Sequence, residues 1–526
     1  MPWTRIDNVG DVGVIKDTGA PKLPLGAWTD ALNVRFLDGS AMQSLGHGSI
    51  YDGAPVTPLH VLPVYLPGSL RYWLYASATK LYAVSAATGS VVHTDLTKQS
   101  GGVDVAYGGA ANKWTSGSLS GIPFFNNGVD APQRWNMNLA SRFADLDAWP
   151  SGMTCKSLRA FKNQLVALNV TKSGTALPYM VKWSTEADPG TVPQSWDETD
   201  PTKDAGEVDL AEGGDPIIDG MQLGGTFMVY KEHSAWRMDY TGGQFVEQFT
   251  KVGGISGAMN LNCIVEVEIG GAPMHVVLTN DDVVAHDGQS ARSILDRQAR
   301  RSLFLAIDAQ NTGLCFVFKN PFLNEVWVCY PEGGFSQPNK ALVWNYSSQT
   351  VSFRELPSIN HANFGPLESS VSQPWDADSA PWDADVSGWS SAEFTPDASR
   401  VLMAANNGKL YLLDSSTTFD GVLPTSYLER RALQLAPPGR RTLIKRILPR
   451  ISGATGQQLT IRAGGADDPY SDPTYSAQAT FTMGSSIDAP VLADARFPAI
   501  RIEAAAGNYA WRLDGLDIEW EPAGYF

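Results

Sequence analysis

The residues best placed to do chemistry lie in a short tandem repeat, "QPWDADSAPWDADVSGW", at residues 373–389. The repeat holds two Asp-x-Asp pairs, Asp376 with Asp378 and Asp383 with Asp385, and a tryptophan every seven residues. Four carboxylates could serve a hard cation such as Ca²⁺, which takes about six to eight oxygen ligands. Two of them could instead act as general acid and base in catalysis.

A structural role competes with both chemical roles. Pro374 and Pro381 stop a helix or a central strand, and each aspartate can close a turn onto backbone N–H groups. Trp375, Trp382 and Trp389 can pin the loop to a β surface or to a neighbouring subunit. Because the loop lacks the glycine hinge and bidentate glutamate of compact calcium loops, we expect the structural role, with metal binding as the open alternative.

The rest of the chain carries no familiar catalytic or cofactor motif. It has no HExxH, no GxSxG, no P-loop and no EF-hand loop, so we expect a protein that is not an enzyme and has no cofactor. Its seven histidines are scattered, and we expect structural roles for them. The cysteines lack metal-site spacing and are predicted to be buried thiols; they are Cys155, Cys263, Cys315 and Cys329.

Composition narrows the possible partners and the compartment. The chain has 526 residues and a formal net charge of −16, which argues against a surface that grips nucleic acid as a whole. The N-terminus lacks the order of a signal peptide, and no apolar run reaches the length of a membrane span. We therefore expect synthesis in the cytoplasm and no membrane span.

The apolar segments predict β-structure. They are short, alternating or β-branched, and they end in Gly, Asn, Asp or Ser. Strand–turn–strand units recur about every 50–70 residues, a repetition typical of propeller blades with large loops. We predict a β-propeller over residues 55–423, with a long loop insertion at 357–399 and with residues 1–54 as an extended segment whose strands join the propeller. A chain of unrelated sandwiches is the alternative.

The sequence changes character after about residue 424. Residues 425–453 hold seven Lys or Arg against one acidic residue. The candidates here for contacts between subunits are Arg440, Arg441, Lys445 and Arg446. Segments that alternate with period two follow, as in half-buried strands, so we predict a β-sandwich-like domain over residues 424–526.

Charge is segregated along the chain. Residues 186–215 hold ten acidic groups and one lysine, and residues 365–400 hold seven acidic groups and one arginine. Such separation suits self-assembly, in which an acidic patch of one subunit meets a basic patch of the next; solvated loops are the alternative. One helix is predicted, over residues 293–308 with Ser293 as its cap.

Several blocks resemble one protein family. They include "LPLGAWTDALNVRFLDGSAMQSLGHGSI" (23–50), "FFNNGVDAPQRWN" (124–136), "NEVWVCYPEGG" (324–334), the tandem "WDAD", and the segment from "ARFPAIRIE" at 495 to the end. Together they look like the tail nozzle or packaged-DNA stabilisation proteins of short-tailed bacteriophages. The resemblance rests on aromatic and turn signatures and carries no catalytic residues.

The resemblance implies a fold and an assembly. The family's fold is a β-propeller with attached β domains, and its assembly is a homo-hexameric ring in the virion tail. That ring docks on the tail adaptor protein, sits near tail fibres or spikes, and surrounds double-stranded DNA without reading its sequence. An acidic lumen would let DNA slide, and 186–215 and then 365–400 are the candidate linings. A tail-associated propeller that binds or cleaves carbohydrate is the alternative.

Overall fold

The computed structural model describes residues 2–66, 70–85, 90–109, 113–242, 247–367, 399–437, 439–504 and 510–525. Among these residues the only α-helix is α1 (Arg300–Ala306), beside three short 3-10 turns, η1 (Ala20–Lys22), η2 (Thr312–Leu314) and η3 (Pro321–Leu323). No helix in this part of the chain is long and apolar enough to cross a membrane. The prediction of an all-β protein is confirmed.

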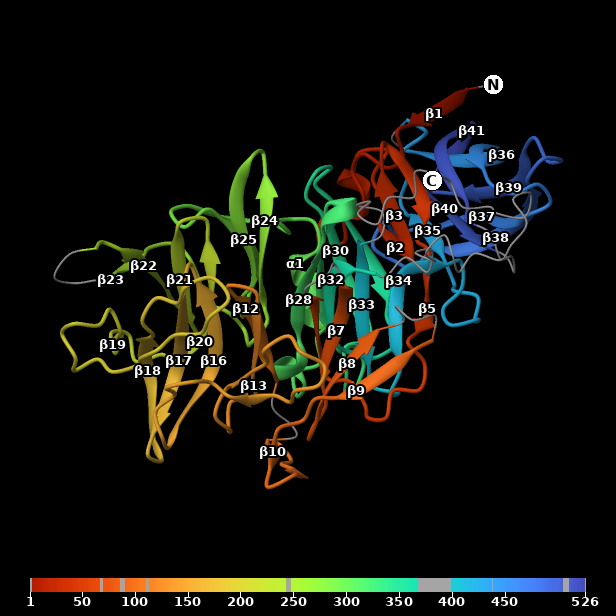
Figure 1. Ribbon diagram of the computed structural model, residues 1–526. Helices are drawn as coiled ribbons and strands as arrows, with labels where there is room; N and C mark the ends of the chain where they lie inside the picture. The colour runs from red at the N-terminus through yellow and green to blue at the C-terminus, as the bar shows by residue number, and fades with distance from the viewer. Residues whose placement is uncertain are drawn as a thin grey trace.

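The described residues form seven four-stranded antiparallel sheets, and Figure 1 shows them as small sheets placed side by side. Their strands are β6 (His60–Leu66), β7 (Leu70–Ala76), β8 (Leu81–Ser85), β9 (Val92–Asp95); β12 (Thr115–Leu119), β13 (Ile122–Asn126), β14 (Gln133–Arg134), β15 (Ala144–Asp145); β16 (Met153–Phe161), β17 (Gln164–Lys172), β18 (Thr175–Trp183), β19 (Gly206–Asp209); β20 (Ile217–Leu223), β21 (Thr226–Lys231), β22 (Ala235–Tyr240), β23 (Glu247–Val252); β24 (Ile264–Ile269), β25 (Ala272–Leu278), β26 (Val283–His286), β27 (Ala291–Ser293); β28 (Phe316–Asn320), β29 (Glu325–Tyr330), β30 (Lys340–Asn345), β31 (Thr350–Glu355); and β32 (Ile359–Pro366), β33 (Ser399–Ala405), β34 (Leu410–Ser416) with β5 (Gly46–Ile50). A two-stranded hairpin, β10 (Gln99–Ser100) with β11 (Val103–Asp104), lies between the first two sheets in the sequence.

The first strand of each sheet lies against the first strand of the next. β12 contacts β16, and the contacts continue through β20, β24 and β28 to β32, which contacts β6 of the first sheet. β6 and β12 are linked by a hydrogen bond between His60 Nε2 and Ser116 Oγ at 2.7 Å. Apolar clusters fill the spaces between neighbouring sheets; one joins the first sheet to the second through Leu74, Phe125 and Trp135. The first strands therefore surround a common centre.

The seventh sheet is completed from the other end of the chain. Its fourth strand, β5, pairs antiparallel with β34, with Ser49 opposite Tyr411. Gly46 begins this strand where a side chain would not fit, because a Cβ atom there would lie 1.9 Å from the carbonyl oxygen of Thr418. The sheet thus joins residues that are more than three hundred positions apart.

The C-terminal residues form two larger sheets together with the N-terminal strands. In Figure 1 they lie at the right of the molecule, in blue and red. The six-stranded sheet contains β1 (Trp3–Asp7), β3 (Val34–Leu37), β4 (Ser40–Gln43), β41 (Arg512–Tyr525), β36 (Arg440–Ser452) and β39 (Ala489–Ala495); the five-stranded sheet contains β2 (Asp30–Leu32), β35 (Tyr427–Arg430), β40 (Phe497–Ala504), β37 (Gln458–Ala466) and β38 (Thr474–Thr482). The N-terminal strands were predicted to join the propeller. Four of them, β1 to β4, belong instead to these two C-terminal sheets.

One apolar core joins the two regions. Its buried members come from the fifth and sixth sheets, the N-terminal segment and both C-terminal sheets, for example Leu278, Trp344, Trp28, Ile444 and Ile502. Trp28 also donates from Nε1 to the Val9 carbonyl at 2.7 Å, which fixes the N-terminal segment against itself. The domain boundaries at residues 54 and 423 remain predictions. The apolar core contains residues from both sides of each boundary.

The predicted helix over 293–308 is wrong in length and in its cap. Ser293 ends β27, and its hydroxyl donates to the Asp282 carboxylate at 3.0 Å. Arg297 then adopts φ 58°, which a helix cannot include, and α1 begins only at Arg300. The cap comes from a distant residue: the carboxylate of Asp17 accepts from the backbone N–H groups of Arg301 and Ser302, at 2.6 and 3.0 Å.

Candidate functional site

The residues of the tandem repeat lie outside the described residues. They are Trp375, Trp382, Trp389, Asp376, Asp378, Asp383 and Asp385. Their roles in anchoring the loop, or in binding a metal, therefore stay predictions. The cysteines and histidines named from the sequence are described, and all four cysteines are buried and free, as expected.

The basic residues of β36 are paired within the chain. Arg441 lies 2.8 Å from Asp494 and 2.9 Å from Asp467, and Lys445 lies 2.8 Å from Glu521. Arg446 contacts Glu519 and Asp488, and Arg440 donates to the Tyr525 hydroxyl at 2.7 Å. The charge that looks segregated in the sequence is therefore largely compensated in space. Contacts of these residues with another subunit remain a prediction.

Part of the acidic segment 186–215 is paired with lysines and part of it is exposed. Asp215 and Glu212 each lie 2.9 Å from a lysine. The Lys182 ammonium, which is buried, lies 2.5 Å from Glu198 and 3.0 Å from Glu207. In contrast, Glu186, Asp188 and Asp204 are exposed. Figure 1 shows β19 and its loops at the opposite end of the molecule from β36 and β39. This segment therefore leaves an acidic surface far from the C-terminal sheets.

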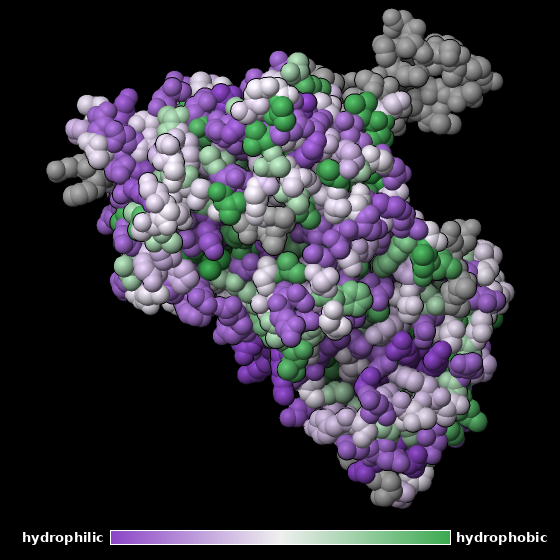
Figure 2. All heavy atoms as spheres, turned by 90° about the horizontal axis from the view of Figure 1, so that it is seen from below, coloured by the Kyte–Doolittle hydropathy of each residue, from purple (hydrophilic) through white to green (hydrophobic). Residues whose placement is uncertain are grey.

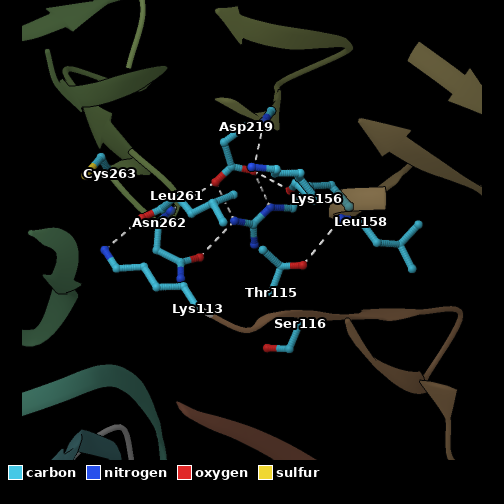
Figure 3. A network of polar contacts seen from close by, with 12 residues as sticks. Lys113, Thr115, Ser116, Lys156, Leu158, Asp219, Leu261, Asn262 and Cys263 are labelled. Carbon is cyan, nitrogen blue, oxygen red and sulfur yellow. Dashed lines mark hydrogen bonds and ion pairs between the residues drawn. The ribbon is translucent and has the colours of Figure 1, made fainter. Parts of the chain in front are cut away.

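A buried ion pair lies where the first strands meet. We call Ser157, Arg159, Asp219, Asn262 and Lys113 the central cluster, part of which is labelled in Figure 3. Arg159 donates to both Asp219 carboxylate oxygens, from Nε at 2.9 Å and from Nη2 at 2.6 Å, and Ser157 Oγ donates to Asp219 at 2.6 Å. The backbone N–H of Asn262 adds a contact at 3.0 Å. β16, β20 and the segment before β24 are thus held to one carboxylate.

The electrostatics of Asp219 keep it ionised. Burial alone would raise its pKa, but the charge of Arg159 and the hydrogen bonds from Arg159 and Ser157 outweigh burial and lower it. Asn262 continues the network, because its Oδ1 accepts from Arg159 at 2.9 Å and its Nδ2 donates to the Trp114 carbonyl at 3.0 Å. The cluster therefore links the second, third, fourth and fifth sheets through side chains with paired charges.

Two histidines lie on the other side of the centre. His60 at the start of β6 and His361 in β32 stack with ring centroids 3.8 Å apart. Burial lowers the pKa of both, that of His361 to about 3, so both are neutral at pH 7. The backbone N–H of Val61 donates to His361 Nδ1 at 3.3 Å, which leaves the proton on Nε2.

A second polar cluster joins the sixth and seventh sheets to β3. Arg35 donates to Glu325 at 2.5 Å and to Asp414 at 2.8 Å, and Arg354 donates to Asp414 at 3.0 Å. Two cations and two carboxylates make this junction cluster neutral. It forms one wall of a mostly apolar cavity of about 480 Å³, which is also lined by Leu413. The same cavity is lined by residues at the edge of the C-terminal sheet, among them Trp511, which directly precedes β41.

Sequence reasoning missed both clusters. Asp219, Arg35 and Glu325 are single charged residues inside apolar strands, Arg159 shares its strand with Lys156, and nothing in their spacing marks them as partners. A buried charge needs a partner, so a lone charge in an otherwise apolar strand is the signal that could have pointed to them. Which residues pair follows only from the order of the sheets around the centre.

Comparison with known proteins gives little. No family model matches the chain, and no curated protein matches it. Among solved structures it is similar to PorZ, described as an essential bacterial surface component of the type-IX secretion system of Porphyromonas gingivalis, with 10% identity and a TM-score of 0.38. That match covers 77% of this chain and 44% of the other.

Proposed function

We propose that the seven four-stranded sheets are the blades of a β-propeller and that the two C-terminal sheets form a β-sandwich-like domain attached to it. The cyclic contacts of the first strands support this arrangement. The pairing of β5 with β34 supports it as well, because propellers commonly close when strands from both chain ends share one blade.

The proposed function is structural: a subunit of the nozzle ring at the distal end of a bacteriophage tail, which retains packaged DNA and lets it leave. The sequence blocks that resemble nozzle proteins support this role. We propose a homo-hexameric ring in the virion, docked on the tail adaptor protein and close to fibres or spikes, with no catalytic residue and no cofactor.

The observation that best supports the proposal is that paired charged side chains join distant parts of the chain. The central cluster, the junction cluster and the β36 pairs each join segments that are distant in the sequence. Such contacts make the subunit stiff, which suits a part that must hold its shape while DNA under pressure passes it. The first strands contact one another around the centre of the subunit, so the DNA path would lie between subunits.

The lumen of the proposed ring would be acidic. The exposed carboxylates Glu186, Asp188 and Asp204 are our candidates for its lining, because like charge keeps a duplex from binding while it slides. On the face shown in Figure 2, hydrophilic residues are widespread and apolar ones are scattered among them. Such a surface suits contact with water and with a polyanion that is held without being gripped.

Electron microscopy of the purified protein, with native mass spectrometry, tests this function. A closed ring with an axial channel, six copies in mass, and protein located at the tip of purified tails would support it. The matched variant replaces Glu186, Asp188 and Asp204 by serine; we expect it to assemble and to release DNA more slowly on mild heating of virions, because less negative charge repels the duplex. A monomer that hydrolyses glycans would overturn the proposal and favour the carbohydrate-active alternative.

A further inference from the structure

A small cavity opens beside the central cluster. Its volume is about 210 Å³, and the residues that matter to its chemistry are His60, Lys113, Trp114, Asn262, Phe316 and His361. They come from the starts of β6 and β28, from β32, and from the segments before β12 and β24. The cavity therefore lies where at least four sheets meet, and its position does not depend on which assembly the chain forms.

Lys113 brings a positive charge to this cavity without a carboxylate partner among the described residues. Its Nζ lies 2.5 Å from the Cys315 carbonyl oxygen and 3.4 Å from the Leu261 carbonyl oxygen. An ammonium group has three N–H donors, so one donor remains beyond these two contacts. Burial lowers the pKa of Lys113, which reflects the cost of a charge in a place poor in water.

The nearest carboxylate is committed elsewhere. Asp219 accepts from Arg159, Ser157 and the Asn262 backbone, and its charge is balanced by Arg159. The Asn262 side-chain oxygen is also taken by Arg159. Lys113 therefore contacts two neutral carbonyl oxygens and no carboxylate, so a negative ligand beside it would be favoured.

His361 adds a donor to the same cavity. Because its Nδ1 accepts from the Val61 backbone, its Nε2 carries the proton. Its ring is fixed between His60, at 3.8 Å between centroids, and Phe316, at 5.8 Å. A fixed N–H donor and an ammonium in one cavity are the groups that bind oxygen atoms of a small anion.

We propose that this cavity binds one small oxyanion of the inorganic phosphate class, held by the Lys113 ammonium and by the Nε2–H of His361. The bound anion would balance the charge of Lys113. It would also tie the segment before β12 to β32 across the centre of the sheets, so it would stabilise the folded chain.

Thermal unfolding of the full chain at pH 7.5 tests the proposal. Potassium phosphate is titrated against potassium chloride at matched ionic strength. We expect the unfolding temperature to rise with the phosphate concentration and not with chloride, because a ligand that binds only the folded state stabilises it. An equal response to both salts, or no response to phosphate, would overturn the proposal.

Lys113→Met provides the decisive variant, since methionine keeps the volume and removes the charge. We expect phosphate affinity, measured by calorimetry, to fall at least about tenfold, which corresponds to ~1.4 kcal/mol. The matched control is Lys203→Met, which removes a lysine on the exposed surface. If Lys113→Met binds phosphate as the control does, the proposal is wrong.

A second pair of variants keeps the test valid if Lys113→Met does not fold. Lys113→Arg retains the charge and is expected to retain the phosphate response. His361→Phe keeps a ring between His60 and Phe316 but loses the donor, and we expect a smaller phosphate response than in the unchanged chain. An undiminished response in His361→Phe would contradict the assigned ligand set.

Discussion

The central cluster and β36 use the same residue types in opposite ways. At the centre, Arg159 and Asp219 are buried and share several hydrogen bonds, and they come from strands of different sheets. Arg441 of β36 contacts Asp494 of the neighbouring strand β39, and both side chains remain partly exposed. Water screens the second pair and not the first, so the same contact has very different weight for stability.

The histidines also distinguish the two regions. We expect the largest change in folding stability when acid protonates them. All seven precede residue 362, so none lies in the C-terminal region. Burial lowers the pKa of four of them to about 3–4: His47, His275, His286 and His361. Since the unfolded chain binds these protons near pH 6.5 and the folded chain does not, their stabilising contribution is complete above pH 6.5 and is lost as the pH falls.

We therefore expect chemical denaturation to show a steep loss of stability between pH 6.5 and pH 4, on the order of 1 kcal/mol per histidine and pH unit. Glu247 acts in the opposite sense, because burial raises its pKa to about 7 and its contribution is lost as the pH rises through that value. Hydrogen exchange should place the acid-induced opening in the seven sheets. Opening that begins in the C-terminal sheets would contradict this prediction.

Asp219→Asn should have the next largest effect. The amide cannot balance Arg159, which would stay buried with a charge that lacks its counter-ion. We expect a loss of about 3–5 kcal/mol in the free energy of unfolding, measured by urea denaturation. A loss below about 1 kcal/mol would mean that the central cluster is not a buried pair in solution.

Asp494→Asn is the matched change on β36. It removes the same carboxylate from an arginine, but Arg441 keeps Asp467 at 2.9 Å and contact with water. We expect a loss within about 1 kcal/mol in the same urea experiment. If the two variants lose equal stability, burial does not separate the two regions.

Raising the salt concentration should have the smallest effect of these changes, and the property to measure is the mass of the assembled protein. Because the cations of β36 already contact carboxylates of their own chain, we expect the mass of the assembled protein to stay the same when the salt concentration is raised. Native mass spectrometry and light scattering at low and high salt would measure it. Dissociation at high salt would restore the role of charge segregation in assembly that the sequence suggests.

Most of the local structure, that is, the presence of strands and turns, could be predicted from the sequence. Alternation after about residue 424 predicted half-buried strands, and β37, β40 and β41 lie in that part of the chain. Period and turn chemistry are local, so they are visible in the sequence alone.

What the sequence did not reveal depends on contacts between distant residues. Asp17 caps a helix 284 positions away, and Arg35 meets Glu325 across 290 positions. Neither pair has a spacing or a motif, and each forms only because the sheets bring these segments together. The partners of the basic run near β36 were hidden for the same reason, since the carboxylates it contacts lie on β39 and β41.

The pairing of β5 with β34 also has a consequence for synthesis. A ribosome releases residues 46–50 long before residues 410–416, and β1 and β4 wait even longer for β41, the strand that ends at Tyr525. Until β41 is made, β1 has no partner for its backbone groups and must stay unpaired without aggregating, whereas β3 and β4 can already pair with each other. Synthesis of β41 is therefore the step that commits the first strand to its place.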